Sequence, residues 1–159
     1  MQLKHILSNI SETYDFSQHQ QVVFLNTGDI LNGKILHSDY SVSKYLPGQA
    51  KKSIRNQDIL FSEIRPANRR FALVNVLTPS DYVVSTKLMV LRCHNSAYDT
   101  EFVYRFITQP KILSELQTLA ESRSGTFPQI TFSEMEPIDI PDIPLERQRH
   151  IVDIRRNIA

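Results

Sequence analysis

The stretch Ser122–Ile151, SRSGTFPQITFSEMEPIDIPDIPLERQRHI, contains in succession several residue types that each favour a different backbone conformation. A polar loop at its start ends at Pro128, whose ring pushes Phe127 towards an extended conformation. Thr131 is followed three residues later by Glu134, which is the pattern of a capping box at the start of a short helix. The stretch therefore predicts a loop, an extended step and then a short helix.

The prolines that follow predict how the chain leaves this short helix. Residues 137–144 contain three prolines, so we expect Pro137 to end the helix, residues 138–140 to form a short strand and an extended connection to follow. A new helix is predicted to begin near Glu146, whose carboxylate favours the positive end of the helix dipole. Its apolar residues repeat at the seam spacing of a coiled coil: Ile151, Ile154 and Ile158.

Upstream of this stretch the sequence predicts strands and turns. Val22–Leu25 predicts a strand, and Asn32 and Gly33 predict a tight hairpin turn because this pair tolerates positive backbone angles. Residues 37–52 lack periodicity and are expected to form an exposed loop or an irregular strand pair. Three longer runs rich in β-branched and aromatic residues come next, at residues 54–64, 71–77 and 82–93.

Helical spacing of apolar residues marks three further segments. Residues 2–10 predict a short helix with one buried face, residues 98–107 predict a second helix, and Pro110 is well placed to start a third. Together with the β-rich runs, they predict an α+β fold. We expect a twisted, mainly antiparallel sheet with a few helices, followed by the start of a long helix.

The composition is that of a soluble globular domain. The 159 residues are 41% hydrophobic and 22% charged, which suffices for one ordinary core. No apolar run approaches the roughly 20 residues that cross a bilayer, and the N-terminus lacks the apolar core of a secretion signal. We therefore expect a cytoplasmic protein. Cys93 is the only cysteine, which excludes an intramolecular disulfide.

Positive charge is concentrated in one part of the chain. The formal net charge is only +1, but the segment from Lys34 to Arg70 contains eight basic and three acidic residues, a local charge of +5. Phosphate groups attract such segments, although a run of charges can equally be a solvated face.

Two motifs together resemble the target recognition domain of the DNA specificity subunit of type I restriction and modification systems. The first is SGTFPQITFSEMEPIDIPDIPLERQRHI, although this chain has Pro141-Asp-Ile-Pro-Leu where the family usually has paired prolines before the glutamate. The second is NQDILFSEIRPANRRFALV followed by DYVVSTKLMVLR, in which Gln57 stands where the family often has glycine. The likeness extends from about Ile54 to the C-terminus.

The resemblance implies a division of the chain and a function. Residues 1–141 would be a target recognition domain, and residues 142–159 would begin the connector helix. In that family, two such domains each read half of a split DNA target. The helices that join them dock methyltransferase subunits, and restriction subunits bind that assembly. This chain would supply one domain, which pairs with another copy or with a second recognition domain.

Candidate DNA-binding residues are chosen by chemistry and by their position in predicted loops. Cations bind phosphates, whereas Arg, Lys, Asn and Gln side chains also read base edges. The first group is Lys44, Tyr45, Lys51, Lys52, Arg65, Asn68, Arg69 and Arg70, and the second is Arg123, Ser124, Thr126 and Gln129. Solvated charges, or a structural turn for the second group, are the alternatives.

The connector helix supplies the candidate partner surface. Its residues are Glu146, Gln148, Ile151, Ile154 and Ile158. A helix of about 15 residues is marginal alone in water, so we expect it to pack on its own domain or to pair with another copy.

Catalysis is not predicted. The five histidines lack the spacing of metal ligands, and no P-loop, dinucleotide-binding or nucleophile-elbow pattern occurs. Asp81 is followed by Ser85, Thr86 and Lys87, so the second acid of a metal-dependent nuclease is missing. We expect neither a metal nor a cofactor. The alternatives are a protein-interaction remnant that has lost DNA binding and a small metal-dependent nuclease.

Overall fold

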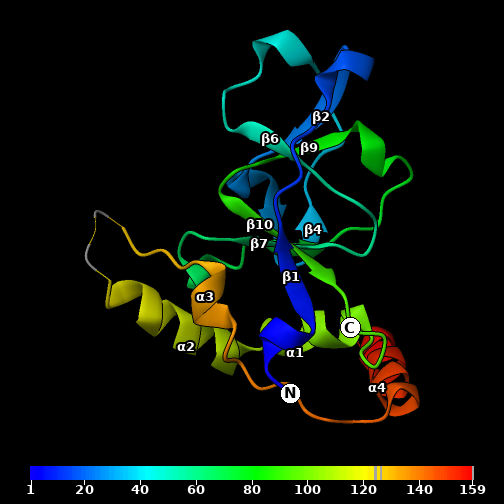
Figure 1. Ribbon diagram of the computed structural model, residues 1–159, viewed down its shortest axis with the longest axis vertical. Helices are drawn as coiled ribbons and strands as arrows, with labels where there is room; N and C mark the ends of the chain where they lie inside the picture. Colours follow the sequence, from blue (N-terminus) through cyan, green and yellow to red (C-terminus); the bar gives the residue numbers. More distant parts are fainter. Residues whose placement is uncertain (124, 126, 159) are drawn as a thin grey trace.

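The strands and helices of the chain are segregated along its long axis. The computed structural model describes residues 1–123, 125 and 127–158. Figure 1 shows the strands in the upper and middle parts of the molecule and the helices at the lower end. This segregation confirms the α+β class.

Four antiparallel strands form the central sheet, in the spatial order β1-β10-β7-β8. The strands are β1 (Leu7–Ile10), β7 (Ile59–Ser62), β8 (Phe71–Leu73) and β10 (Leu88–Cys93). Alternate side chains of this sheet face opposite layers: Phe61 and Met89 face the helices, whereas Leu60 and Val90 face the second sheet. Burial on both faces explains why residues 59–61 of β7 and 88–91 of β10 are all apolar.

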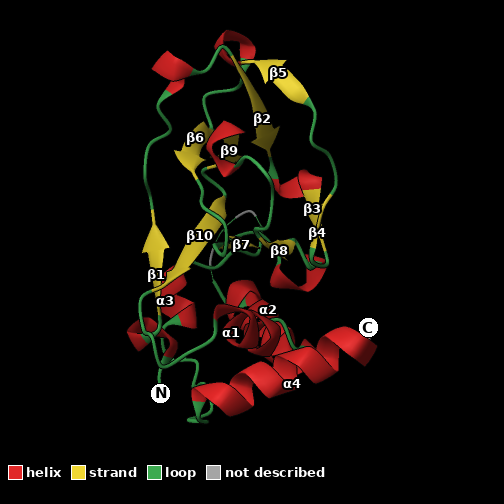
Figure 2. Cartoon of the chain, turned by 90° about the vertical axis from the view of Figure 1, so that its right-hand side faces the viewer, coloured by secondary structure: helices red, strands yellow, loops and turns green. Residues whose placement is uncertain are grey.

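The second sheet lies above the first in the view of Figure 2 and has the order β5-β2-β9-β6. It contains β2 (Gln21–Leu25), β5 (Tyr40–Val42), β6 (Ala50–Ser53) and β9 (Tyr82–Ser85). The pair β2 and β9 is parallel, whereas the other pairs are antiparallel. Separately, β3 (Ile30–Leu31) and β4 (Lys34–Ile35) form a hairpin through Asn32 and Gly33, whose φ angles are 48° and 90°.

The helices cover the free face of the central sheet. They are α1 (Thr100–Ile107), α2 (Pro110–Glu121), α3 (Phe132–Met135) and α4 (Leu145–Ile158). Figure 2 shows α4 running beneath α1. Short 3-10 helices occupy the turns: η1 (Leu3–His5), η2 (Phe16–Gln18), η3 (Thr27–Asp29), η4 (Ser43–Tyr45), η5 (Pro66–Asn68) and η6 (Pro79–Asp81). No helix in the described ranges is long and apolar enough to cross a bilayer.

Several local predictions are confirmed. The Asn-Gly hairpin, the helix start at Pro110 and the capping box of Thr131 and Glu134 are all present. Residues 40–42 and 50–53 form strands within the segment expected to be an exposed loop or an irregular strand pair.

Three other expectations are wrong. Residues 2–10 form η1 and then β1, because β10 offers this segment a complete antiparallel partner, with Leu7 opposite Cys93. Residues 138–140 form only an isolated bridge, between Asp139 and Gln2. The β-rich runs divide between two sheets, because the chain crosses from β9 to β10 within two residues.

Candidate nucleic-acid interface

The loop between β7 and β8 has an unusual backbone at two candidate arginines. Arg65 and Arg69 flank η5, and both adopt left-handed conformations, with φ angles of 44° and 59°. Each such residue costs an L-amino acid roughly 1–2 kcal/mol. Backbone hydrogen bonds hold the loop closed, from Asn68 N to Arg65 O (2.8 Å) and from Arg69 N to Pro66 O (3.1 Å). The loop therefore has one defined shape despite its strain.

The β3–β4 hairpin braces one side of this loop. The backbone N–H of Asn32 donates to Arg69 O at 2.7 Å, and that of Gly33 donates to Phe71 O at 2.9 Å. A third hydrogen bond runs from the loop to the hairpin, because the Arg70 side chain donates to Ile30 O at 3.2 Å. The hairpin and the η5 loop are thus one cross-linked unit.

Two further segments brace the other side of the loop. Arg65 N donates to Pro128 O at 3.0 Å, and Ile130 N donates to the carbonyl oxygen of Glu63 at 2.8 Å. From α2, the side chain of Gln117 accepts a hydrogen bond from the backbone N–H of Ala67 at 3.0 Å. These contacts bring together the following predicted residues: Arg65, Asn68, Arg69, Arg70 and Gln129.

Glu63 is the acidic member of this region. Burial raises the pKa of its carboxyl group, and the nearby cations Lys52, Lys87 and Arg123 partly oppose that rise. Lys52 is itself half-buried and donates to Leu88 O at 2.8 Å. Burial lowers the pKa of its ammonium group. Lys52 is thus engaged by the fold, whereas Lys87 is an exposed cation at this site that sequence reasoning missed.

The remaining upstream candidates lie elsewhere. Lys44 and Tyr45 belong to η4, at the upper end of the molecule in Figure 1, far from the helices. Tyr45 is 77% exposed, and the Lys44 ammonium lies 5.0 Å from the centre of its ring. Lys51 is exposed on the edge strand β6. The structure therefore divides the candidates into a distal group and the braced loop.

The second predicted group is only partly described. The Arg123 guanidinium forms an ion pair with Glu134, the capping-box residue of α3. Gln129 pairs with Ile64 in an isolated β-bridge. Ser124 and Thr126 lie outside the described residues.

The candidate partner residues on α4 do not share one face. Gln148 is fully buried, and Ile151 packs at the edge of the core. Ile154 and Ile158 are 45% and 77% exposed, and Glu146 is also exposed. Val152, rather than the isoleucines, is the buried apolar anchor of the helix, and it belongs to the same cluster as α1 and α2.

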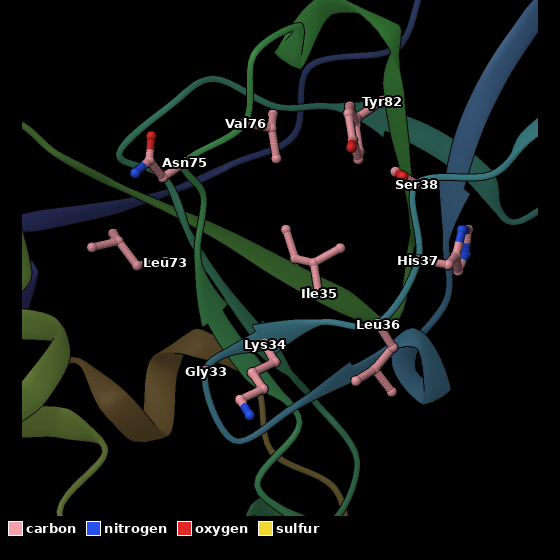
Figure 3. Close-up of a pocket in the computed structure, with 10 residues that line it drawn as sticks. All are labelled: Gly33, Lys34, Ile35, Leu36, His37, Ser38, Leu73, Asn75, Val76 and Tyr82. Atoms are coloured by element: carbon pink, nitrogen blue, oxygen red, sulfur yellow. The ribbon is translucent and has the colours of Figure 1, made fainter. Parts of the chain in front are cut away.

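An open cleft of about 660 Å³ lies beside the hairpin. Figure 3 shows Ile35 directed into it, opposite Val76 and Tyr82, with Lys34 and Asn75 at the periphery. Within the described ranges no three histidine, cysteine, aspartate or glutamate side chains gather in a way that could hold a metal ion.

Comparison with known proteins shows the family of the chain. The model of the type I restriction modification DNA specificity domain matches residues 6–157. The specificity subunit of the type I restriction enzyme HindI from Haemophilus influenzae is 46% identical over 153 residues, which are 96% of this chain and 33% of that protein. The chain thus spans about a third of the length of this curated relative.

Solved structures show the same fold. The HsdS subunit from Thermoanaerobacter tengcongensis superposes with a TM-score of 0.83 at 26% identity, covering 99% of this chain and 41% of that one. A structure from work on the assembly and conformational transition of the type I R-M system superposes with a TM-score of 0.80 at 21% identity, with the same coverage. At that identity, the second likeness concerns the fold alone.

Proposed function

The chain belongs to the family of type I restriction modification DNA specificity domains, and from this membership we propose that it recognises one half of a split double-stranded DNA target. It acts by binding rather than by catalysis. Residues 1–141 form the recognition domain, and residues 142–159 begin the helix that joins it to a second recognition domain or to another copy of this chain.

The braced η5 loop is the observation that carries this proposal. It gathers Arg65, Asn68 and Arg69 at a single place, next to the exposed Lys34 and Lys87. Fixed cations give sequence-independent attraction to phosphates, and fixed Arg and Asn side chains can pair with base edges. A loop held in a strained backbone by partners on two sides, with Arg65 and Asn68 exposed, is preorganised for such contacts.

The partners follow from the family and from the surface of α4. Methyltransferase subunits, and through them restriction subunits, are proposed to bind the assembled connector helices. Ile154 and Ile158 would contribute to the packing between helices, because they stay exposed while Gln148 and Val152 are buried in this domain. Glu146 lies exposed near the start of the same helix.

Selection from random duplex DNA tests the proposal. This chain, together with the methyltransferase subunit encoded beside it, is expected to enrich a short motif that the methyltransferase alone does not enrich. Arg65→Ala combined with Asn68→Ala is expected to weaken enrichment, because both side chains are exposed and their removal leaves the braces intact.

Arg149→Ala is the matched control, since Arg149 is an exposed arginine on α4. Its enrichment should equal that of the unchanged chain. If the unchanged chain forms a stable complex with the methyltransferase and still enriches no motif, DNA recognition by this domain is refuted.

A further inference from the structure

Resting on the proposed function, we propose that Arg69 reads a guanine of the target and that Asn32 is the residue that positions its guanidinium. Neither role can be inferred from the hairpin or from the basic loop alone. Both roles are inferred from the contacts that join the hairpin to the loop.

Two contacts fix the direction of the Arg69 side chain. Its Nε donates to the side-chain oxygen of Asn32 at 3.0 Å, and its guanidinium carbon lies 5.5 Å from the centre of the Phe71 ring. Phe71 is 3% exposed and is itself held between Phe61 and Tyr104, with ring centres 5.8 and 6.0 Å away. The guanidinium therefore rests on a rigid part of the core.

The backbones of Arg69 and Asn32 are fixed as well. The N–H of Asn32 donates to the carbonyl of Arg69 at 2.7 Å, and both residues adopt left-handed conformations. Asn32 adopts this conformation as part of the hairpin turn, whereas the strain at Arg69 persists only because the surrounding structure overdetermines it, and such strain clusters at functional sites. Here it holds a donor and its acceptor at a fixed separation.

The neighbouring arginines are held differently. Arg70 directs its Nη1 at the carbonyl oxygens of Ile30 and Gly28, so that group serves the hairpin. Arg65 is exposed, and its side chain makes no hydrogen bond or ion pair within the described part of the chain. Of these three arginines, Arg69 alone combines an anchored Nε with two Nη groups that donate to no described residue.

This arrangement suits guanine. In the major groove guanine presents two adjacent acceptors, O6 and N7, which match the paired donors at the end of an arginine. Because Asn32 occupies Nε, the two Nη groups form the remaining donor edge. A lysine at this position would keep the charge but lose the fork. Arg65, which has no such anchor, is suited to phosphate contact.

The test is the same selection, performed with the full chain and three variants. Arg69→Lys keeps the charge, Arg149→Lys on α4 is the matched control because Arg149 is exposed and lies outside the loop, and Asn32→Gly removes the positioning oxygen while tolerating the left-handed backbone. Thermal unfolding of each variant verifies that it is folded before selection.

We expect Arg69→Lys to lose preference at one G·C pair of the motif, by roughly 5- to 150-fold, the range that a bidentate contact supplies. Asn32→Gly should weaken preference at that same pair, by a smaller factor, and leave the rest of the motif unchanged. Arg149→Lys should keep the whole motif.

Each other result overturns a distinct statement. If folded Arg69→Lys keeps the full motif, Arg69 only holds the loop to the hairpin and does not recognise a guanine. If folded Asn32→Gly lowers affinity equally for all sequences, or leaves the G·C preference intact, Asn32 has no positioning role. An unchanged chain that enriches no motif overturns the proposed function, and this inference with it.

Discussion

The side-chain oxygen of Gln148 accepts a hydrogen bond from the backbone N–H of Asp99 at 2.8 Å, which links α4 to the residue that caps α1. The Gln148 side-chain nitrogen donates to Ala97 O and Ile143 O, at 3.0 and 2.7 Å. Its side chain is fully buried. One amide thus joins the start of α4, the approach to α1 and the proline-rich connection.

Replacing this amide should be costly. Gln148→Met keeps the volume but leaves three part-buried backbone groups without their partner, so we expect a loss of roughly 1–3 kcal/mol in the free energy of unfolding. Urea denaturation measures it. Arg149→Ala, at the exposed neighbouring position, should change stability by less than about 0.5 kcal/mol. Equal effects of the two substitutions would contradict the role given to Gln148.

A substitution at Gln57 should instead increase the stability of the domain. Its φ angle is 74°, and its N–H donates to Val74 O at 2.8 Å. Glycine adopts this conformation without steric cost, so Gln57→Gly should stabilise the domain by roughly 0.5–1 kcal/mol. Gln57→Ala is the control, because it removes the side chain and keeps the strain. A gain with alanine equal to that with glycine would show that the backbone is not the cause.

The stability contributed by the contact between α1 and α4 should depend on pH. Hydrogen bonds from Arg156 and then Arg105 hold the pKa of Glu101 below the ordinary value of a glutamate, although burial opposes them. A carboxylate with a lowered folded pKa contributes stability that is present above the unfolded pKa and is lost as the pH falls through the folded value. The contribution of Glu101 should therefore be complete at neutral pH, begin to decrease near the ordinary pKa of a glutamate, about 4.3, and be lost as the pH falls further through the lower folded pKa.

Unfolding of the unchanged chain and of Glu101→Gln over pH 3 to 7 measures this loss. The variant should be less stable at neutral pH, and the difference should shrink on acidification. Glu115→Gln, an exposed change on α2, should show no such trend. A difference between Glu101→Gln and the unchanged chain that stays constant across the range would refute the linkage.

Packing of α4 should distinguish Val152 from Ile154. Val152 is 3% exposed, so Val152→Ala should cost about 2 kcal/mol of unfolding free energy. Ile154 is 45% exposed, so Ile154→Ala should cost less than about 1 kcal/mol in the monomer. Urea denaturation at low protein concentration compares them, and a larger cost at Ile154 would contradict the orientation of the helix.

The exposed side of α4 should instead govern association. We expect the isolated chain to pair through Ile154 and Ile158 at high concentration, and Ile154→Asp with Ile158→Asp to prevent it. Analytical ultracentrifugation over a wide concentration range measures the mass. Detection of monomer alone at the highest concentration would refute self-pairing.

Local chemistry was sufficient for part of this fold. The hairpin at Asn32 and Gly33, the helix start at Pro110 and the capping box of Thr131 and Glu134 depend on residues within a few positions of each other. Their backbone preferences therefore appear in the sequence itself. The same holds for the basic character of residues 34–70, which follows from composition alone.

Tertiary structure decided the remaining features of the fold and of the candidate site, because the residues that form them are far apart along the chain. Residues 2–10 have helical spacing, yet pairing with β10 made part of them a strand. The basic loop could be located from sequence, but Asn32 and Arg69 are 37 positions apart, so no local pattern could reveal their hydrogen bond. The sequence determined which side chains carry charge, and the packing of distant segments determined which of them are held in one direction.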